Sequence, residues 1–257
     1  MLDKSPKPAR IRQVPALSRG IAVLRLLSTS EEPLGVHAVA RALSLVPSTC
    51  LHILRVLADE RLVVVDPETK KYTVAVGLVA LARTALRRHT FPALVQPQLD
   101  DLARSYGATA VAVEANGLDH MVVVALARSS SPLRLNVDIG SRFPALISAT
   151  GRCVAAFGRY PRAEIDERFA RLRWDDPPSL AEWHAEIAAA RKNAYAIDDG
   201  RYIGGIAIAA ATVCLPNGTI NALVVVGVAE QMRRLSLLTI GEDLRVRAAE
   251  VSRALGA

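Results

Sequence analysis

The chain has 257 residues, of which 51% are hydrophobic and 4% aromatic, and its net charge is +7 at pH 7. This length is sufficient for two cores, so we expect two domains with mostly aliphatic interiors. No apolar run reaches the roughly 18 residues that a membrane-spanning helix needs, and the amino terminus lacks the hydrophobic stretch of a signal peptide. We therefore expect a cytoplasmic protein without a membrane partner.

The net positive charge of the chain comes entirely from its front third. Residues 1–90 contain 14 Lys or Arg against 7 Asp or Glu, whereas residues 91–257 contain 18 of each kind. Lys and Arg bind nucleic-acid phosphates whatever the base sequence, and the released counterions supply much of the affinity. A small basic domain joined to a larger neutral one is typical of proteins that combine DNA binding with sensing.

The basic domain begins with an arm, residues 1–14, that is rich in proline and in basic residues. Ser18 is a suitable N-cap for a first helix, because apolar side chains recur at helical spacing after it until residues 28–30. A polar break at residues 31–33 separates this helix from a shorter second one. The apolar positions that define the second helix are Val36, Val39, Ala40 and Leu43.

A turn at residues 44–46 leads into a third helix, for which Pro47 is a suitable first residue because its missing N–H would have no partner there. This spacing indicates a helix-turn-helix unit, whose last helix enters the major groove of DNA with its amino-terminal half. The polar side chains outside the apolar stripe of this helix are Ser48, Thr49, His52 and Arg55. They are candidates for contacts to base edges and phosphates, and an ordinary solvated helix face is the alternative.

Runs of β-branched residues at 62–65 and 72–74 flank a polar turn that contains Pro67, which predicts a β-hairpin. Lys70 and Lys71 lie at or near its tip. Beside a helix-turn-helix unit, such lysines are typical of a wing that touches phosphates, although exposed lysines also serve solubility alone. We expect residues 78–91, which are strongly helical, to form a linker helix between the domains.

Three segments in register make the basic domain resemble the winged-helix domain of the IclR-type bacterial transcription regulators. They are Ser18-Arg19-Gly20-Ile21-Ala22-Val23-Leu24, Pro47-Ser48-Thr49 and Tyr72-Thr73-Val74-Ala75-Val76-Gly77-Leu78. The resemblance implies a winged helix-turn-helix DNA-binding domain over residues 15–77. The residues that we expect to contact double-stranded DNA are Arg19, Pro47, Ser48, Thr49, His52, Arg55, Lys70 and Lys71.

The larger domain, residues 92–257, alternates helices with strands. We expect helices at 94–106, 151–160, 162–173, 181–193 and 232–255, and strands at 109–115, 121–127, 206–215 and 219–228. Turns at Asn116-Gly117 and Pro216-Asn217-Gly218 favour hairpins between successive strands, and therefore an antiparallel sheet. The fold class is α+β, with helices on the faces of the sheet as in GAF-like sensor domains.

This second domain resembles the IclR effector-binding domain, so the resemblance extends over residues 15–256. The matching segments are Gly140-Ser141-Arg142-Phe143-Pro144, Ser148-Ala149-Thr150-Gly151-Arg152, Asp198-Asp199, Gly205-Ile206-Ala207-Ile208-Ala209-Ala210-Ala211 and Asn217-Gly218. In the family, the turn that matches Ala149-Thr150-Gly151 opens a helix whose free N–H groups and positive dipole end receive a ligand's carboxylate. The resemblance thus implies ligand contacts from Ser148, Ala149 and Thr150, although plain N-capping explains the two hydroxyl residues nearly as well.

The chain departs from the family pattern where small keto acids would bind. Gly200 and Arg201 follow Asp198-Asp199 where many members carry acidic residues, Ile208 stands where acid-binding members have a cysteine, and Val224-Val225-Val226 replaces serines of a late strand. Aliphatic walls leave polar ligand atoms without partners, so we expect a larger, partly apolar organic acid rather than glyoxylate or pyruvate. Arg201 is a candidate partner for its carboxylate, with a surface salt bridge as the alternative. The remaining ligand-binding candidates are Asp198, Ile208, Val224 and Val226.

These features predict a DNA-binding transcription regulator that recognises a palindromic operator and is controlled by a small-molecule effector. A single recognition helix reads few base pairs, so two half-sites related by a two-fold axis are the usual solution, and we expect a homodimer or homotetramer. The alternative is a ligand-independent DNA-binding or interaction protein whose cavity is filled by its own Val and Ile side chains.

The sequence contains no catalytic, metal or cofactor signature. The three cysteines are widely spaced without a C-x-x-C pair, the five histidines lack metal-ligand spacing, and P-loop, G-x-G-x-x-G and G-x-S-x-G motifs are absent. An enzyme tethered to DNA would need a catalytic constellation, and the nearest carboxylate pairs, Asp175-Asp176 and Asp198-Asp199, are typical of loops. We therefore expect a protein that is not an enzyme and has no cofactor.

Overall fold

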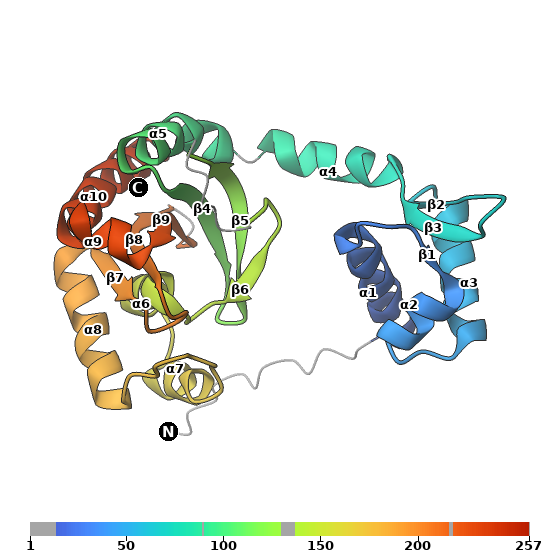
Figure 1. Ribbon diagram of the computed structural model, residues 1–257, viewed down its shortest axis with the longest axis horizontal. Coiled ribbons are helices and arrows are strands. Elements are labelled where there is room, and N and C mark those ends of the chain that lie inside the picture. Colours follow the sequence, from blue (N-terminus) through green and yellow to red (C-terminus); the bar gives the residue numbers. More distant parts are fainter. Residues whose placement is uncertain (1–13, 89, 130–136, 216–217, 257) are drawn as a thin grey trace, which may run out of the picture. The chain divides into compact units, whose positions relative to one another are not determined.

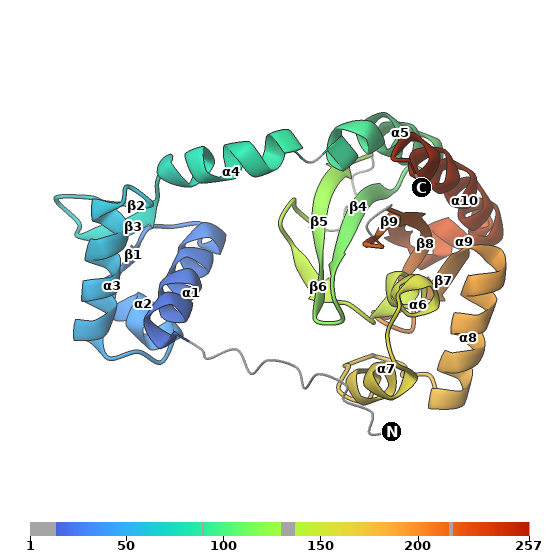
Figure 2. The same cartoon turned by 180° about the vertical axis from the view of Figure 1, so that it is seen from behind.

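The computed structural model describes residues 14–88, 90–129, 137–215 and 218–256. The chain divides into two compact units, Met1–Arg88 and His89–Ala257. Figure 1 and Figure 2 show the elements of each unit from opposite sides. Apart from Val14, the basic arm expected at the amino terminus lies outside the described residues.

In its described part, residues 14–88, the first unit contains a small antiparallel sheet with strand order β1-β3-β2 and four helices. Its elements are α1 (Pro15–Thr29), β1 (Leu34–Gly35), α2 (Val36–Ala42), α3 (Pro47–Asp59), β2 (Val63–Val65), β3 (Lys71–Val74) and α4 (Gly77–Arg88). The predicted helix-turn-helix and hairpin are confirmed, and Pro47 occupies the first turn of α3 as expected.

The backbone of the turn between α2 and α3 is closely defined. Ser44 has a left-handed φ of 52°, which reverses the chain and lets the N–H of Leu45 donate to the carbonyl of Ala40 at 2.8 Å. The buried residues of this unit are Val23, Leu27, Val39, Ala40, Cys50, Leu54, Leu57, Val63 and Tyr72. Because the apolar side of α3 is part of this core, its other side faces solvent.

Two details of the first unit differ from the sequence prediction. Helix α1 begins at Pro15, since proline also suits a first turn, so Ser18 lies inside the helix and its hydroxyl donates to the carbonyl of Val14 at 3.4 Å instead of capping. Strand β1 was not expected because two residues cannot show a periodic pattern. It forms because Leu34 and Gly35 pair with β3.

The second unit is built on a six-stranded antiparallel sheet with strand order β6-β5-β4-β9-β8-β7. Its helices are α5 (Thr90–Tyr106), α6 (Ser148–Phe157), α7 (Arg162–Phe169), α8 (Leu180–Asn193), α9 (Ala229–Arg234) and α10 (Leu237–Ala254). Its strands are β4 (Thr109–Asn116), β5 (His120–Ala127), β6 (Arg142–Pro144), β7 (Tyr195–Asp199), β8 (Ile206–Cys214) and β9 (Ile220–Val228). The predicted α+β class and antiparallel hairpins are confirmed.

Helices cover both faces of this sheet, which explains why β8 and β9 are apolar along their length. Helices α5 and α10 pack on the face that carries Leu223 and Val225. Helix α6 packs on the other face, which carries Val224 and Val226, and α8 packs in turn against α6. Since α6 lies mainly against β7, β8 and β9, the same face of β4 and β5 is left to line a cavity.

The sequence pattern does not reveal β6 and β7, and it predicts one helix at 232–255 where the structure has two. Strand β6 has three residues, and β7 starts directly after Ala194, whose left-handed φ of 59° ends α8. The predicted helix at 232–255 is instead the pair α9 and α10, which are separated at Ser236, where φ is 65° and the hydroxyl accepts the N–H of Thr239 at 3.4 Å. Helix α6 begins at Ser148 rather than Gly151.

Within the described ranges, no single helix is long and apolar enough to cross a membrane. Helices α2 and α3 reach the necessary length and composition only when taken together, across a bend of 112°.

Gly151 allows α6 to approach the preceding turn closely. A Cβ at this position would lie 2.2 Å from the carbonyl oxygen of Leu146, so an alanine forces the backbone apart. We expect Gly151→Ala to lower the free energy of unfolding by about 1–3 kcal/mol, measured by urea unfolding. The control is Gly204→Ala, whose Cβ would meet Asp175 Oδ2 at 3.6 Å, and equal stability of the two variants would contradict this account.

The phenol of Tyr106 links α5 to α10, because it donates to Asp243 Oδ2 at 3.0 Å while Arg247 Nε donates to Oδ1 at 2.9 Å. Burial and the hydrogen bond to Asp243 raise the pKa of Tyr106 from 10 to about 12. The contribution of the protonated phenol is therefore complete below about pH 10 and is lost as the pH rises toward 12. We expect the difference in urea midpoint between the wild type and Tyr106→Phe to shrink over this interval, and a constant difference would show that the phenol is not the titrating group.

Candidate functional site

The exposed side of α3 carries the polar residues expected from the sequence. Ser48, His52 and Arg55 are exposed, Thr49 is half-buried, and Cys50, Leu54 and Leu57 on the opposite side are buried. Because residues three or four positions apart share a helix face, Ser48, His52 and Arg55 form one exposed surface. Pro47 is exposed at the beginning of that surface, and Arg19 is exposed on α1, which packs against α3.

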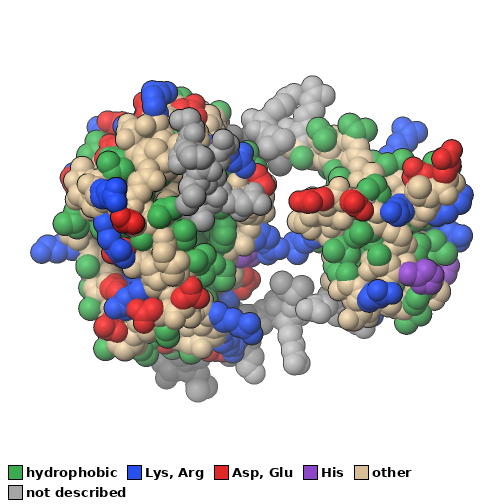
Figure 3. Space-filling model, viewed as in Figure 1, with side chains coloured by type: hydrophobic (Ala, Val, Ile, Leu, Met, Phe, Trp, Pro, Cys, Tyr) green, Lys and Arg blue, Asp and Glu red, His purple; other side chains and the backbone are tan. Residues whose placement is uncertain are grey.

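The hairpin between β2 and β3 holds its lysines on a defined turn. Asp66 Oδ1 accepts the backbone N–H groups of Glu68 and Thr69, both at 2.8 Å, and these hydrogen bonds lower the pKa of Asp66. Lys70 has a left-handed φ of 54°, and Lys70 and Lys71 are exposed. Figure 3 shows Lys and Arg side chains projecting from the edge of this unit that α3 and the hairpin form.

The second unit contains a cavity of about 200 Å³ on the face of the sheet that α6 shares. The described residues that line it are Val111, Val113, Met121, Val137, Phe143, Ile147, Ser148, Thr150, Tyr202, Ile203, Ile206, Ile208, Val224 and Val226. All of these side chains are apolar except those of Ser148, Thr150 and Tyr202, and none is charged. The cavity therefore suits a ligand with an apolar body and few polar groups.

The polar end of the cavity is the first turn of α6. Ile147 enters the helix in an extended conformation and Ser148 has a φ of 61°. The hydroxyl of Ser148 accepts the N–H of Ala149 at 2.6 Å, but the N-cap of α6 is Ile147 and no side chain caps the helix, so the capping alternative does not describe Ser148. The first N–H groups of a helix have no partner within the helix, and they give this end of the cavity a positive potential.

The predicted ligand-binding residues separate into two groups. Ser148, Thr150, Ile208, Val224 and Val226 line the cavity. The remaining three, Ala149, Asp198 and Arg201, are absent from its described lining.

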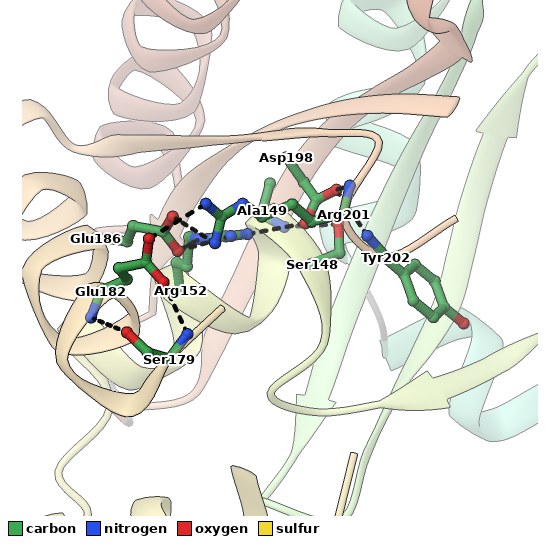
Figure 4. A network of polar contacts seen from close by, with 9 residues as sticks. All are labelled: Ser148, Ala149, Arg152, Ser179, Glu182, Glu186, Asp198, Arg201 and Tyr202. Atoms are coloured by element: carbon green, nitrogen blue, oxygen red, sulfur yellow. Dashed lines mark hydrogen bonds and ion pairs between the residues drawn. The ribbon is translucent and has the colours of Figure 1, made fainter. Parts of the chain in front are cut away.

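Asp198 and Arg201 are instead engaged in a polar network with residues of α6 and α8 (Figure 4). The carboxylate of Asp198 accepts Arg152 Nη1 and the backbone N–H groups of Arg201 and Tyr202, each at 3.1 Å. The guanidinium of Arg201 lies 3.6 Å from Glu182 and 3.9 Å from Glu186. Arg201 therefore forms salt bridges with Glu182 and Glu186, as the alternative interpretation of this residue predicts.

Several lining residues were not singled out from the sequence. Val111, Val113 and Met121 are inward-facing residues of β4 and β5, which alternation along those strands would have found. Tyr202 carries no motif and is placed by the loop between β7 and β8. Burial, followed by the nearby charge of Asp175, raises the pKa of its phenol, which therefore stays protonated at neutral pH.

Among the residues that the structure describes, no three His, Cys, Asp or Glu side chains gather as a metal site. The three thiols are free, with Cys50 and Cys153 buried. Burial raises the pKa of Cys153 to about 11, which keeps this thiol protonated and unreactive.

Comparison with known proteins agrees with both units. A family model described as bacterial transcriptional regulator IclR C-terminal matches residues 83–253, and one for the IclR helix-turn-helix domain matches residues 16–67. The glycerol operon regulatory protein of Streptomyces coelicolor is 30% identical over 257 residues, which cover 96% of this chain and 98% of that protein. The HTH-type transcriptional repressor AllR of Escherichia coli K12 is 23% identical over 261 residues, covering 97% and 93%.

Solved structures share the fold. The IclR transcriptional regulator of Alicyclobacillus acidocaldarius has a TM-score of 0.81 and 25% identity and covers 95% of this chain and 100% of that one. An IclR homolog of Microbacterium hydrocarbonoxydans, crystallised with 4-hydroxybenzoate, has a TM-score of 0.78 and 16% identity and covers 94% and 99%. The matching families are regulators rather than enzymes, and the chain belongs to the IclR family of bacterial transcriptional regulators.

Proposed function

We propose that this regulator binds a palindromic DNA operator as a homodimer or homotetramer and is controlled by a small, partly apolar organic acid. In this proposal residues 15–77 bind DNA, residues 78–91 link the domains, and residues 92–257 bind the effector and form the oligomer. Because bacterial DNA lies in the cytoplasm, we propose that the protein acts there. The effector class is inferred from the cavity, because its walls are aliphatic and one end is the first turn of a helix.

DNA binding is assigned to α3 and the hairpin. The exposed surface of α3 supplies hydroxyl, imidazole and guanidinium groups from Ser48, Thr49, His52 and Arg55, which suit base edges and phosphates in a major groove. Lys70 and Lys71 add phosphate contacts from the hairpin, and Arg19 and Pro47 complete the candidate surface. The two-fold symmetry of a dimer would present two such surfaces to two half-sites, which explains the palindromic operator in the proposal.

The effector is assigned to the cavity with its carboxylate at the first turn of α6. Free N–H groups and the helix dipole favour an anion there, and the hydroxyls of Ser148 and Thr150 are suitable additional donors. Ile208, Val224 and Val226 would contact an aromatic or aliphatic body. The 4-hydroxybenzoate bound by the Microbacterium hydrocarbonoxydans homolog is an acid of this kind.

A cavity of about 200 Å³ supports effector control over the ligand-independent alternative, which requires the protein's own side chains to fill this space. Regulation would follow if the effector binds the DNA-competent and DNA-incompetent states with unequal affinity. The described residues that line the cavity include no charged group. An effector with several charges is therefore disfavoured, because nothing in the cavity would compensate for the desolvation of those charges.

Isothermal titration calorimetry with 4-hydroxybenzoate, pyruvate and glyoxylate tests the effector class. We expect 4-hydroxybenzoate to bind at least about tenfold more tightly than either keto acid, which corresponds to about 1.4 kcal/mol from the apolar contacts that only the ring can make. Val224→Ser adds a hydroxyl to the wall and should weaken binding of the aromatic acid. Tighter binding of the keto acids to the wild type would refute the proposed class.

Gel-shift assays with Arg55→Ala and Lys70→Asn test the DNA surface. Arg55→Ala should weaken operator binding by about 1–3 kcal/mol if the residue reads a base, with relaxed specificity. Lys70→Asn removes a charge but tolerates the left-handed φ of this position, so it should weaken all duplexes alike and reduce the salt dependence of binding. Glu68→Gln, on the same turn, is the control for damage to the hairpin. Wild-type affinity in both test variants would contradict this surface.

A further inference from the structure

Two walls of the effector cavity come from distant parts of the sequence. One is the first turn of α6, which contributes Ser148 and Thr150, and the other is the loop 200–205, which contributes Tyr202 and Ile203. Gly200 and Gly205 at the ends of this loop have φ values of 83° and 80°, which only glycine adopts without strain. Since glycine leaves a loop many alternative conformations, contacts outside the loop must select the one in which Tyr202 meets the cavity.

Asp198 supplies one such contact from the end of β7. Its side chain is fully buried, and one oxygen accepts the backbone N–H groups of Arg201 and Tyr202 while the other accepts Arg152 Nη1. A carboxylate has four acceptor positions, so this single group joins the loop to α6. Figure 4 shows Asp198 between Arg152 on one side and the backbone of Arg201 and Tyr202 on the other.

Arg152 holds its position through contacts on several sides. It is 2% exposed, Nε and Nη2 lie 2.7 Å from Glu186 on α8, and its guanidinium lies over the rings of Trp174 and Trp183 at 5.7 and 5.2 Å. Only an arginine combines a planar fork with stacking on aromatic rings. Arg152 lies one helical turn after Ser148, so the same short helix carries both the cavity wall and the ion pair.

Asp175 holds the loop from the other side, because its carboxylate accepts the N–H of Gly204 at 2.7 Å. The backbone N–H groups of Asp176 and Asp175 donate to the carbonyls of Arg201 and Tyr202 at 3.0 and 3.3 Å. The segment 175–176 thus holds these two carbonyls and the N–H of Gly204, whereas Asp198 holds the N–H groups of Arg201 and Tyr202. Because Asp198 also contacts Arg152 on α6, it joins the loop to the helix that carries the other cavity wall.

We propose that Arg152 and Asp198 are positioning residues of the effector cavity, whose buried ion pair holds the loop 200–205 against the first turn of α6 and thereby sets Tyr202 for contact with the ligand. Neither residue is part of the described cavity lining, so they act through Tyr202 and α6. The inference about ligand contact rests on the proposed effector function, whereas the inference about loop position does not.

Hydrogen–deuterium exchange of the full-length protein tests the loop position without a ligand. Asp198→Asn replaces one carboxylate oxygen by an N–H₂ group, which donates and accepts no hydrogen bond, so the side chain can no longer accept Arg152 and both loop amides together. We expect exchange in the peptide that covers residues 199–204 to become at least about tenfold faster, because a net hydrogen bond to a charged group is lost. Unchanged exchange in a folded Asp198→Asn protein would overturn the proposal.

Arg152→Lys provides a second variant that keeps the positive charge. A compact ammonium cannot contact Glu186 and Asp198 and stack on two rings at once, so faster exchange in the same peptide is expected here too. The matched control is Asp243→Asn, which makes the same chemical change at a hydrogen-bonded carboxylate between α5 and α10. The control should lower stability but leave exchange at 199–204 unchanged, and equal acceleration in the control would reduce the role of Asp198 to general stability.

Calorimetric titration with 4-hydroxybenzoate tests the connection to ligand contact through a double-mutant cycle. In the wild type, Tyr202→Phe should weaken binding, whereas in the Asp198→Asn background the same change should have no further effect because Tyr202 is already displaced. Additive effects would overturn the positioning role. If the wild type binds no aromatic acid, the effector class fails while the exchange experiment still decides the loop position.

Discussion

The architecture of the second unit depends on the requirement that both faces of one antiparallel sheet be covered. Helices α5 and α10 cover one face of the sheet, but α6 covers only part of the other. The inward side chains of β4 and β5 therefore meet an open volume rather than a helix, and Ile208, Val224 and Val226 of β8 and β9 complete its wall. A cavity with aliphatic walls is the direct result of this partial cover, and its polar end is the terminus of the helix that covers the remainder.

The first unit follows a different constraint, because its function requires one helix to be half buried and half free. The small core shared by α1, α2, α3 and the hairpin fixes the apolar side of α3, and the left-handed turn at Ser44 sets where the helix begins. The hairpin is held in a similar way by Asp66, so that two flexible lysine side chains extend from a defined backbone. Defined backbones with mobile charges at their tips are well suited to a phosphate surface.

Part of the fold and of the site could be predicted from the sequence. Helical spacing identified the free side of α3, and the resemblance to the IclR effector-binding domain identified five residues that line the cavity. Tyr202 and Phe143 could not be found in this way, because their positions depend on the course of a loop and on the pairing of β6 with β5. Asp198 was assigned to the ligand from its motif, but its carboxylate turns to Arg152, which is distant in sequence. Tertiary structure decides which of two neighbouring polar residues lines the cavity and which forms an ion pair.

The aromatic corner around Arg152 has a spectroscopic consequence. The chain contains two tryptophans, and both lie in this corner, where Trp183 stacks on Phe169 with ring centroids 4.9 Å apart. All indole emission of the protein therefore originates in the second unit, and the first unit is silent at these wavelengths. In a denaturation experiment, emission reports the melting of one unit while circular dichroism reports the helices of both, so a gap between the two curves measures how independently the halves of this regulator unfold.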